Sequence, residues 1–322
     1  MFGAPPHELP QRISFLLVPR FTLLTFASFI DPLRMANRMS GKELYKWSLY
    51  SQDGEAVHSS CGLEVAVDGN IQTIDPRSAV VVASGLDVHH IIDNRLISWL
   101  RRIERQGAVI GGICTGAWLL AKAGLLDNHS CTIHWENIAA LSEEYPELDV
   151  TSDIYEVDGK RFTCSGGTAS IDLVLKLIRD QHGSELATMV ADQFVVDRIR
   201  DEFDGQKISL PARLGVKHPK LLQVIQRMEA NLEEPLSRSE LAVEASLSTR
   251  QLERLFRKYL NRSPARYYLE LRLNRARLLL LQTNMSVIDV ALACGFVSAS
   301  HFSKCYRDFF GKTPRRERGL LG

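Results

Sequence analysis

The sequence predicts an α/β domain with a mainly parallel sheet and helices on both faces, followed by a smaller all-α domain. Roughly the first two hundred residues alternate strand-like apolar runs with helical periodicity, whereas residues 218–322 show helical periodicity alone. Charge divides the chain in the same way. Residues 1–217 hold 21 Lys and Arg against 28 Asp and Glu, and residues 218–322 hold 18 against 10. The basic second domain is therefore the part expected to meet a polyanion.

Strands and helices of the first domain are expected in alternation along the chain. Strands are predicted at ISFLLV, KWSLYS, LEVAVDG, AVVVAS and AVIGGI, which are residues 13–18, 46–51, 63–69, 79–84 and 108–113. Helical spacing covers 21–39, 94–107, 115–124 and 168–183. Pro32 is expected to kink or restart the first of these helices, and Asp158-Gly159 is expected to turn a hairpin. Such alternation predicts a parallel sheet covered on both faces.

A length of 322 residues suits two domains. We assign residues 1–203 to the first domain and 218–322 to the second. The stretch 204–217 is predicted as a linker, because it contains Gly and Pro and has little apolar periodicity. No apolar run long enough to span a membrane occurs, and the first residues do not have the pattern of a secretory signal. The six cysteines are scattered without a C-x-x-C pair, which favours reduced thiols in a cytoplasm, with no metal or cofactor.

The C-terminal third contains an internal repeat. Residues 241–264 align with 290–314, so that Ser246 matches Gly295. Each copy is predicted as a short helix, a tight turn at the small residue and a second helix. This is the pattern of a helix-turn-helix, whose second helix enters the major groove of DNA. The apolar helix predicted over 264–282 would hold the two reader helices rigidly, about 34 Å apart, on one face of a duplex.

The second helix of each copy supplies the candidate DNA-contacting side chains. Arg and Gln near the start of such a helix suit base edges, later basic residues suit phosphates, and Ser hydroxyls can also cap free amides. A plain helical bundle with a solvated basic face is the alternative, and the presence of two matching copies counts against it. The candidates are Thr249, Arg250, Gln251, Arg254, Arg257 and Lys258 in the first copy, and Ser298, Ser300, His301 and Lys304 in the second.

Residues 218–322 resemble the DNA-binding domain of AraC-type transcription regulators. The string ALACGFVSASHFSKCYRDFFGKTP carries the most specific part of this resemblance. It implies sequence-specific binding of double-stranded DNA and, since most members of that family are activators, an activating role with RNA polymerase as a partner. A homodimer is also expected, and residues 184–196 have apolar spacing suited either to packing or to a dimer interface.

The stretch GGICTGAWLLAKAGLL places Cys114 at a sharp turn between a strand and a helix, where nucleophilic enzymes hold a catalytic thiol. The dipole of the following helix is expected to make this thiol more acidic. Together with TIHWEN and TCSGGTASIDL, this stretch resembles the class I glutamine amidotransferase-like superfamily, which includes PfpI-type peptidases and implies a flavodoxin-like sheet. It resembles still more the noncatalytic form fused to AraC-type domains, called the GlxA group.

Departures from the enzymes favour binding over turnover. Thr115 stands where PfpI-type enzymes usually carry a His, and the stretch LTFASFID lacks the Glu of related members. Loops at the carboxyl ends of the strands are expected to form a ligand cleft. Trp135 beside carboxylates would hold a cationic or quaternary ammonium group. The candidate ligand-binding residues are Asp31, Cys114, Thr115, His134, Trp135, Glu136 and Thr168.

The sequence thus predicts a ligand-responsive transcription regulator that is not an enzyme. The resemblance points to amino acids or to betaine- and carnitine-like compounds as small-molecule effectors. Two alternatives stay open at this point. One is a Cys-dependent hydrolase or amidase tethered to DNA, and the other is a thiol redox sensor that uses Cys114.

Overall fold

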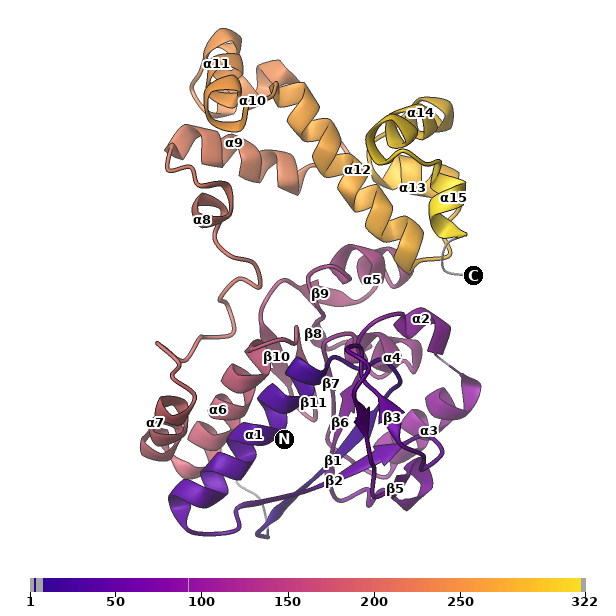
Figure 1. Cartoon of the computed structure of the whole chain (residues 1–322), viewed down its shortest axis with the longest axis vertical. Coiled ribbons are helices and arrows are strands. Elements are labelled where there is room, and N and C mark those ends of the chain that lie inside the picture. The colour runs from indigo at the N-terminus through magenta and orange to yellow at the C-terminus, as the bar shows by residue number, and fades with distance from the viewer. Residues whose placement is uncertain (1–2, 4–7, 92, 320–322) are drawn as a thin grey trace. The chain divides into compact units, whose positions relative to one another are not determined.

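The computed structural model describes residues 3, 8–91 and 93–319, and the chain divides into two compact units, Met1–Gln206 and Lys207–Gly322 (Figure 1). The first unit is built on a seven-stranded sheet in the order β10-β11-β7-β6-β1-β2-β5. All neighbours in this sheet are parallel except β10 and β11, which form a hairpin at one edge. The strands are β1 (Gln11–Leu17), β2 (Tyr45–Ser51), β5 (Gly69–Asn70), β6 (Ala79–Ala83), β7 (Ile110–Ile113), β10 (Tyr155–Asp158) and β11 (Arg161–Cys164).

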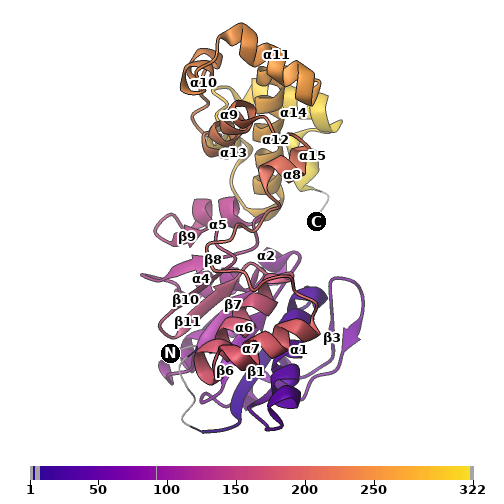
Figure 2. The same ribbon diagram turned by 90° about the vertical axis from the view of Figure 1, so that its left-hand side faces the viewer.

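Helices cover both faces of this sheet, so the predicted flavodoxin-like α/β fold is confirmed. One face carries α1 (Leu23–Ser40), α6 (Ala169–His182) and α7 (Ser184–Gln193), which Figure 2 views from the front. Their apolar sides pack in one core with β1, as Phe15, Phe29 and Leu173 show. The other helices of this unit are α2 (Val88–Ile91), α3 (Asn94–Arg105), α4 (Gly116–Lys122), α5 (Ile138–Glu144) and the short 3₁₀ turn η1 (Ile71–Thr73).

Two details of the first unit differ from the sequence expectation. Pro32 lies inside α1, which continues to Ser40 and ends at Gly41 in the left-handed conformation. The strand predicted over 63–69 is reduced to β4 (Glu64–Val65), which pairs with β3 (Val57–His58) outside the main sheet. No side chain in 63–69 is fully buried, and only Val65 and Val67 pack against the core, so the core offers little to hold a longer strand there. A further small pair, β8 (Ser130–Thr132) and β9 (Asp149–Thr151), is parallel.

The second unit is helical. Its helices are α8 (Leu210–Leu214), α9 (Pro219–Ala230), α10 (Arg238–Glu244), α11 (Thr249–Leu260), α12 (Pro264–Gln282), α13 (Val287–Ala293), α14 (Ala299–Phe310) and α15 (Pro314–Arg318). The stretch proposed as a linker, 204–217, contains α8, and Leu210 and Val216 belong to the core of this unit. Serine or threonine side chains accept a backbone N–H at the start of most of these helices, for example Ser248 for α11 and Ser298 for α14.

The long helix α12 joins two similar halves of the second unit. It has 19 residues, which gives a length of about 28 Å at the α-helical rise. Its Tyr267 and Tyr268 pack with Leu252 and Phe256 of the first half. Its Arg272 donates to the carbonyl oxygens of Cys294 and Gly295 in the second half, each at 2.7 Å. Within the described part of the chain, none of the helices is long and apolar enough to cross a membrane.

Candidate functional site

Cys114 lies at a sharp turn between β7 and α4, with φ of +59°. Gly116 makes the turn possible, because a Cβ there would lie 2.3 Å from the carbonyl oxygen of Val82. The cysteine is only 7% exposed, and its Sγ is 3.5 Å from Thr22 Oγ1. Burial raises the pKa of the Cys114 thiol, and the hydrogen bond with Thr22 opposes this shift only in part. The expected acidification by α4 is therefore wrong, since desolvation outweighs the dipole of a seven-residue helix.

A cavity of about 200 Å³ lies next to this turn. His134 connects the two, because its backbone N–H donates to the carbonyl oxygen of Cys114 at 3.3 Å. Gly166 separates them, since a Cβ at Gly166 would lie 2.9 Å from Cys114 Cα. The volume is below the roughly 300–1,000 Å³ of drug-sized sites, so it suits a small metabolite. The lining residues are His134, Trp135, Ile154, Ser165, Gly166, Gly167, Thr168, Ala169, Arg200 and Gln206.

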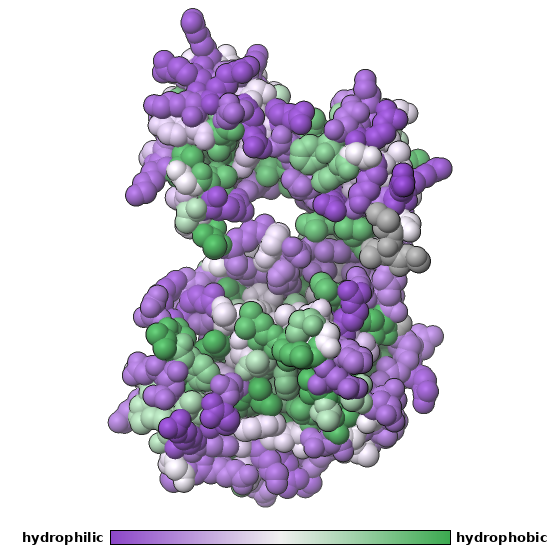
Figure 3. Space-filling view, in the orientation of Figure 1, coloured by the Kyte–Doolittle hydropathy of each residue, from purple (hydrophilic) through white to green (hydrophobic). Residues whose placement is uncertain are grey.

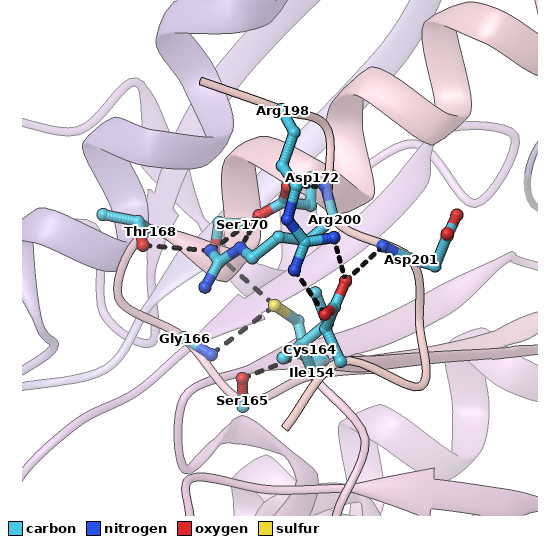
Figure 4. A network of polar contacts seen from close by, with 11 residues as sticks. Ile154, Cys164, Ser165, Gly166, Thr168, Ser170, Asp172, Arg198, Arg200 and Asp201 are labelled. Carbon is cyan, nitrogen blue, oxygen red and sulfur yellow. Dashed lines mark hydrogen bonds and ion pairs between the residues drawn. The ribbon is translucent and has the colours of Figure 1, made fainter. Parts of the chain in front are cut away.

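A charged network forms one wall of the cavity (Figure 4). Arg200 donates through Nε and Nη2 to Asp172 Oδ2, at 2.9 and 2.6 Å, and its backbone N–H donates to Asp172 Oδ1 at 2.8 Å. The same Nη2 reaches Thr168 Oγ1 at 3.0 Å. The side chain of Asp172 is 3% exposed and belongs to the first turn of α6, where a negative charge is favoured. Arg200 is thereby fixed with its guanidinium at the edge of the cavity.

The second unit contains two helix-turn-helix units. Helices α10 and α11 form the first, and α13 and α14 form the second. The turns are made at Ser246 and Gly295, the two residues matched in the sequence repeat, and both have positive φ. Polar side chains on the outer faces of α11 and α14 are exposed, whereas Leu252, Phe256, Phe302 and Tyr306 are buried.

Comparisons with known proteins agree with both parts of this architecture. The DJ-1/PfpI family matches residues 11–180, and a helix-turn-helix domain family matches residues 241–319. The chain is 48% identical to the HTH-type transcriptional regulator GbdR of Pseudomonas aeruginosa, over 98% of this chain and 86% of the relative. It is 38% identical to the HTH-type transcriptional regulator GlxA of Rhizobium meliloti, over 97% of each. The crystal structure of an AraC family transcriptional regulator from Pseudomonas putida covers 57% of this chain and all of its own, with 30% identity and a TM-score of 0.53.

This chain belongs to the AraC family of HTH-type transcriptional regulators. Its first unit is a DJ-1/PfpI domain, and the resemblance to the GlxA group inferred from the sequence is confirmed. An AraC-family regulator with this helix-turn-helix region is a DNA-binding protein.

The ten residues predicted to contact DNA lie in α11 and in α14 with its N-cap. All ten predicted DNA-contacting residues are exposed. Two of them also cap their own helices: Gln251 Oε1 accepts the N–H of Ser248, and Ser298 Oγ accepts the N–H of His301. His301 Nε2 lies 3.3 Å from Cys305 Sγ on the same helix. Arg250, Arg254 and Lys304 are the exposed basic side chains in the first two turns of these helices.

The predicted ligand-binding residues separate into three groups: those that line the cavity, those beside it and those that point elsewhere. His134, Trp135 and Thr168 line the cavity, and Trp135 is 37% exposed. Cys114 lies behind Gly166, and Glu136 Oε2 lies 3.9 Å from His134 Nδ1.

Two predicted residues point elsewhere. The buried hydroxyl of Thr115 donates to the carbonyl oxygen of Gly85 at 2.6 Å. Asp31 accepts from Arg34 Nε at 2.5 Å, one turn further along α1, and does not line the cavity.

Sequence reasoning missed Arg200 and Gln206. Both come from the irregular segment after α7, where no periodicity marks a buried or converging side chain. Gly166 and Gly167 were missed as well, although a glycine pair one residue after β11 is a usable signal, because it stands near the carboxyl end of a strand that is parallel to β7. Gly167 N–H donates to Thr25 Oγ1 at 2.8 Å and so ties this loop to the start of α1.

Proposed function

We propose that this regulator binds a small zwitterion, with a carboxylate and an ammonium group, in the cavity of its first unit and thereby changes its action on DNA. One observation carries the proposal: a metabolite-sized cavity is lined by a partly exposed tryptophan and by a fixed arginine. The face of Trp135 suits a primary or alkylated ammonium group by cation–π attraction. Arg200 suits a carboxylate, since its contacts with Asp172 and Thr168 leave Nη1 without a partner among the described residues.

The effector is tested by thermal unfolding of the full chain with glycine, its N-methyl, N,N-dimethyl and N,N,N-trimethyl derivatives, carnitine and arginine. A ligand that binds only the folded protein stabilises it by about 2.7 kcal/mol at a concentration of 100 Kd. At least one compound is expected to raise Tm in the wild type and to leave Trp135→Ala unchanged. Leu63→Ala, at a residue 58% exposed and outside the cavity, is the matched control and should keep the shift. No shift with any compound, or a full shift in Trp135→Ala, contradicts the proposal.

The proposal excludes turnover at Cys114. The buried thiol with its raised pKa is a poor nucleophile at neutral pH, and the relatives that match the whole chain are transcriptional regulators. Cys114→Ala is therefore expected to keep both the thermal shift and the DNA response of the wild type. A hydrolase or amidase would lose its product formation in this variant, and a redox sensor would lose its response to peroxide.

The proposal also includes activation through RNA polymerase and a homodimeric form. Apolar side chains on the surface of the first unit, visible in Figure 3, support self-association; Leu24 and Leu86 are 56% and 49% exposed. Residues 184–196 contribute less to such a surface than their spacing suggests, because Ala187, Val190 and Ala191 are buried against α1 and α6. Sedimentation of the full chain tests the dimer, and run-off transcription with purified RNA polymerase tests activation.

A further inference from the structure

Residues 198–206, which we call the exit segment, form a wall of the cavity and also lead into the second unit. Arg200 and Gln206 line the cavity, and Gln206 is the last residue of the first unit. The next residue, Lys207, already belongs to the second unit. Any change in how this segment is held is therefore passed directly to the chain that enters the DNA-binding unit.

The exit segment is attached to the first unit at three places. Arg200 is bound by Asp172 and Thr168, as described above. The second attachment is to residues 153 and 154. There the N–H of Ile154 donates to the carbonyl oxygen of Glu202 at 3.0 Å, and Gly205 forms an antiparallel bridge with Asp153. Between these attachments the segment contains no helix and only this one bridge, so side chains and single backbone contacts determine its position.

Gln206 makes the third attachment. Its Nε2 lies within hydrogen-bonding distance of three oxygens, Thr132 Oγ1 at 2.9 Å, the Ile133 carbonyl at 3.0 Å and the Asp153 carbonyl at 2.9 Å. Ile133 directly precedes His134, and Asp153 directly precedes Ile154, and both of these following residues line the cavity. The amide of Gln206 therefore connects the junction of the two units to the backbone of two cavity loops.

The exit segment is also braced within itself. Arg198 donates to both carboxylate oxygens of Asp204, at 2.9 and 2.5 Å, and the N–H of Asp201 donates to Asp204 Oδ2 at 2.9 Å (Figure 4). A bidentate pair of this kind fixes the geometry of the turn that it closes. These contacts join residues on either side of Arg200 to Asp204, two residues before Gln206.

We propose that the exit segment binds the effector and transmits this binding to the DNA-binding unit. Arg200 is the residue that binds the carboxylate, and Gln206 is a positioning residue at the junction of the two units. This inference rests on the proposed function. A carboxylate bound to Arg200 adds a partner to a guanidinium that already holds the segment on Asp172, and so stabilises one placement of residues 198–206. By linkage, DNA binding that favours this placement raises effector affinity by the same factor.

The first test asks whether the DNA response needs the direct covalent connection from Gln206 to Lys207, independently of effector binding in the cavity. A Gly-Ser-Gly-Ser insertion is placed between Gln206 and Lys207. The matched control is the same insertion between Asp158 and Gly159, in the half-buried turn of the β10–β11 hairpin. The probes are glycine, its three N-methylated forms, carnitine and arginine. The readouts are the Tm shift of the full chain and the change in affinity for a duplex selected in vitro with the wild-type chain.

The expected result is that both insertions keep the Tm shift. Only the insertion after Gln206 reduces the probe-dependent change in DNA affinity. This change is expected to be about tenfold in the wild type and less than about twofold in that variant. A full DNA response in that variant overturns the inference and leaves the proposed function intact. If no probe raises Tm in the wild type, the proposed function fails, and the inference fails with it.

The second test uses side chains. Gln206→Leu removes the amide donor at similar size, and Gln193→Leu, at an exposed glutamine at the end of α7, is the control. We expect Gln206→Leu to lose at least about fivefold of the DNA response, measured at probe concentrations that saturate the variant as judged by its own Tm shift. Arg200→Lys is expected to weaken probe binding itself by about tenfold, because a lysine cannot replace the planar donor set. Equal DNA responses in Gln206→Leu and Gln193→Leu contradict the role of Gln206.

Discussion

Ser246 and Gly295 share the left-handed backbone conformation, with φ of +52° and +73°, at matching turns of the two helix-turn-helix units. The two turns differ in how much space surrounds this residue. A Cβ at Gly295 would lie 2.7 Å from the carbonyl oxygen of Glu233 and from Pro235 Cδ. The second turn therefore requires glycine for both conformation and space, whereas the first accommodates a serine.

The asymmetry gives a stability prediction. Gly295→Ala is expected to destabilise the second unit by about 1–3 kcal/mol, since it adds left-handed strain and a contact that is too short. Ser246→Gly is expected to change stability by less than about 1 kcal/mol, because relief of strain offsets the greater freedom of the unfolded chain. Native-state hydrogen exchange of α10 and α13 in the full chain measures both. Equal losses in the two variants would show that the turns are not constrained in this way.

DNA affinity should separate the two kinds of basic residue on α11. Arg250→Ala, at the start of the helix, is expected to cost about 1–3 kcal/mol on a selected duplex and to relax base preference at one position. Lys258→Ala, two turns later, is expected to weaken binding to all sequences alike and to reduce the salt slope by about one. Both are measured by titration at several salt concentrations, with Cys114→Ala as the control that keeps wild-type affinity. A change of base preference in Lys258→Ala alone would reverse the assignment of the two residues.

The repeat and the parallel sheet could be predicted from the sequence because local patterns determine them. Ser246 and Gly295 occupy equivalent places in two copies of one motif, and the apolar runs of β1, β6 and β7 are continuous because both of their faces are buried. The strand predicted at 63–69 formed only in part. Val65 and Val67 pack partly buried against the core, but the alternation of residue types does not reveal that Glu64–Val65 pairs outside the main sheet.

The cavity could be predicted only in part. His134, Trp135 and Thr168 follow strands or precede helices, where side chains converge in such folds. Arg200 and Gln206 depend on a segment without periodicity, folded back by contacts with Asp172 and with the Ile133 carbonyl. The pKa of Cys114 was predicted in the wrong direction, because the sequence shows the following helix but not the depth of burial.

The cysteines should react in an order set by their environments. Cys61 is exposed, and hydrogen bonds from Ser59 and from the Leu63 backbone lower the pKa of its thiol. Burial raises the pKa of Cys114. A thiol reagent at neutral pH is therefore expected to modify Cys61 first and Cys114 slowly, with the rate at Cys114 rising as the pH increases. Mass spectrometry of tryptic peptides follows both sites, and Cys61→Ser removes the fast phase. Rapid labelling of Cys114 would instead revive the redox-sensor alternative.

Glu317 on α15 is a buried carboxylate whose side chain is 2% exposed and which anchors the last helix to α12. Its Oε1 lies 3.0 Å from Arg277 Nε, and its Oε2 lies 3.0 Å from Lys312 Nζ. Burial alone would raise the pKa of Glu317, but hydrogen bonds and charges from Lys312 and Arg277 prevail and lower it from its ordinary value of 4.5. A carboxyl with a lowered folded-state pKa contributes stability above its unfolded pKa and loses that contribution as pH falls through the folded value.

Glu317→Gln is therefore expected to destabilise the second unit at neutral pH by about 1.5–3 kcal/mol, the range for hydrogen bonds to charged groups. The difference from the wild type should begin to shrink as the pH falls below about 4.5, where the carboxyl of the unfolded chain takes up its proton. It should be lost once the pH has also fallen through the lower pKa of the native carboxyl. Denaturant unfolding of the full chain at several pH values, followed by hydrogen exchange of α15, measures the difference. Glu234→Gln, at an exposed carboxylate, is the matched control and should stay near the wild type throughout. A loss that is constant across this pH range would mean that the substitution acts through packing alone, and the ion pairs would then contribute nothing to holding α15 on α12.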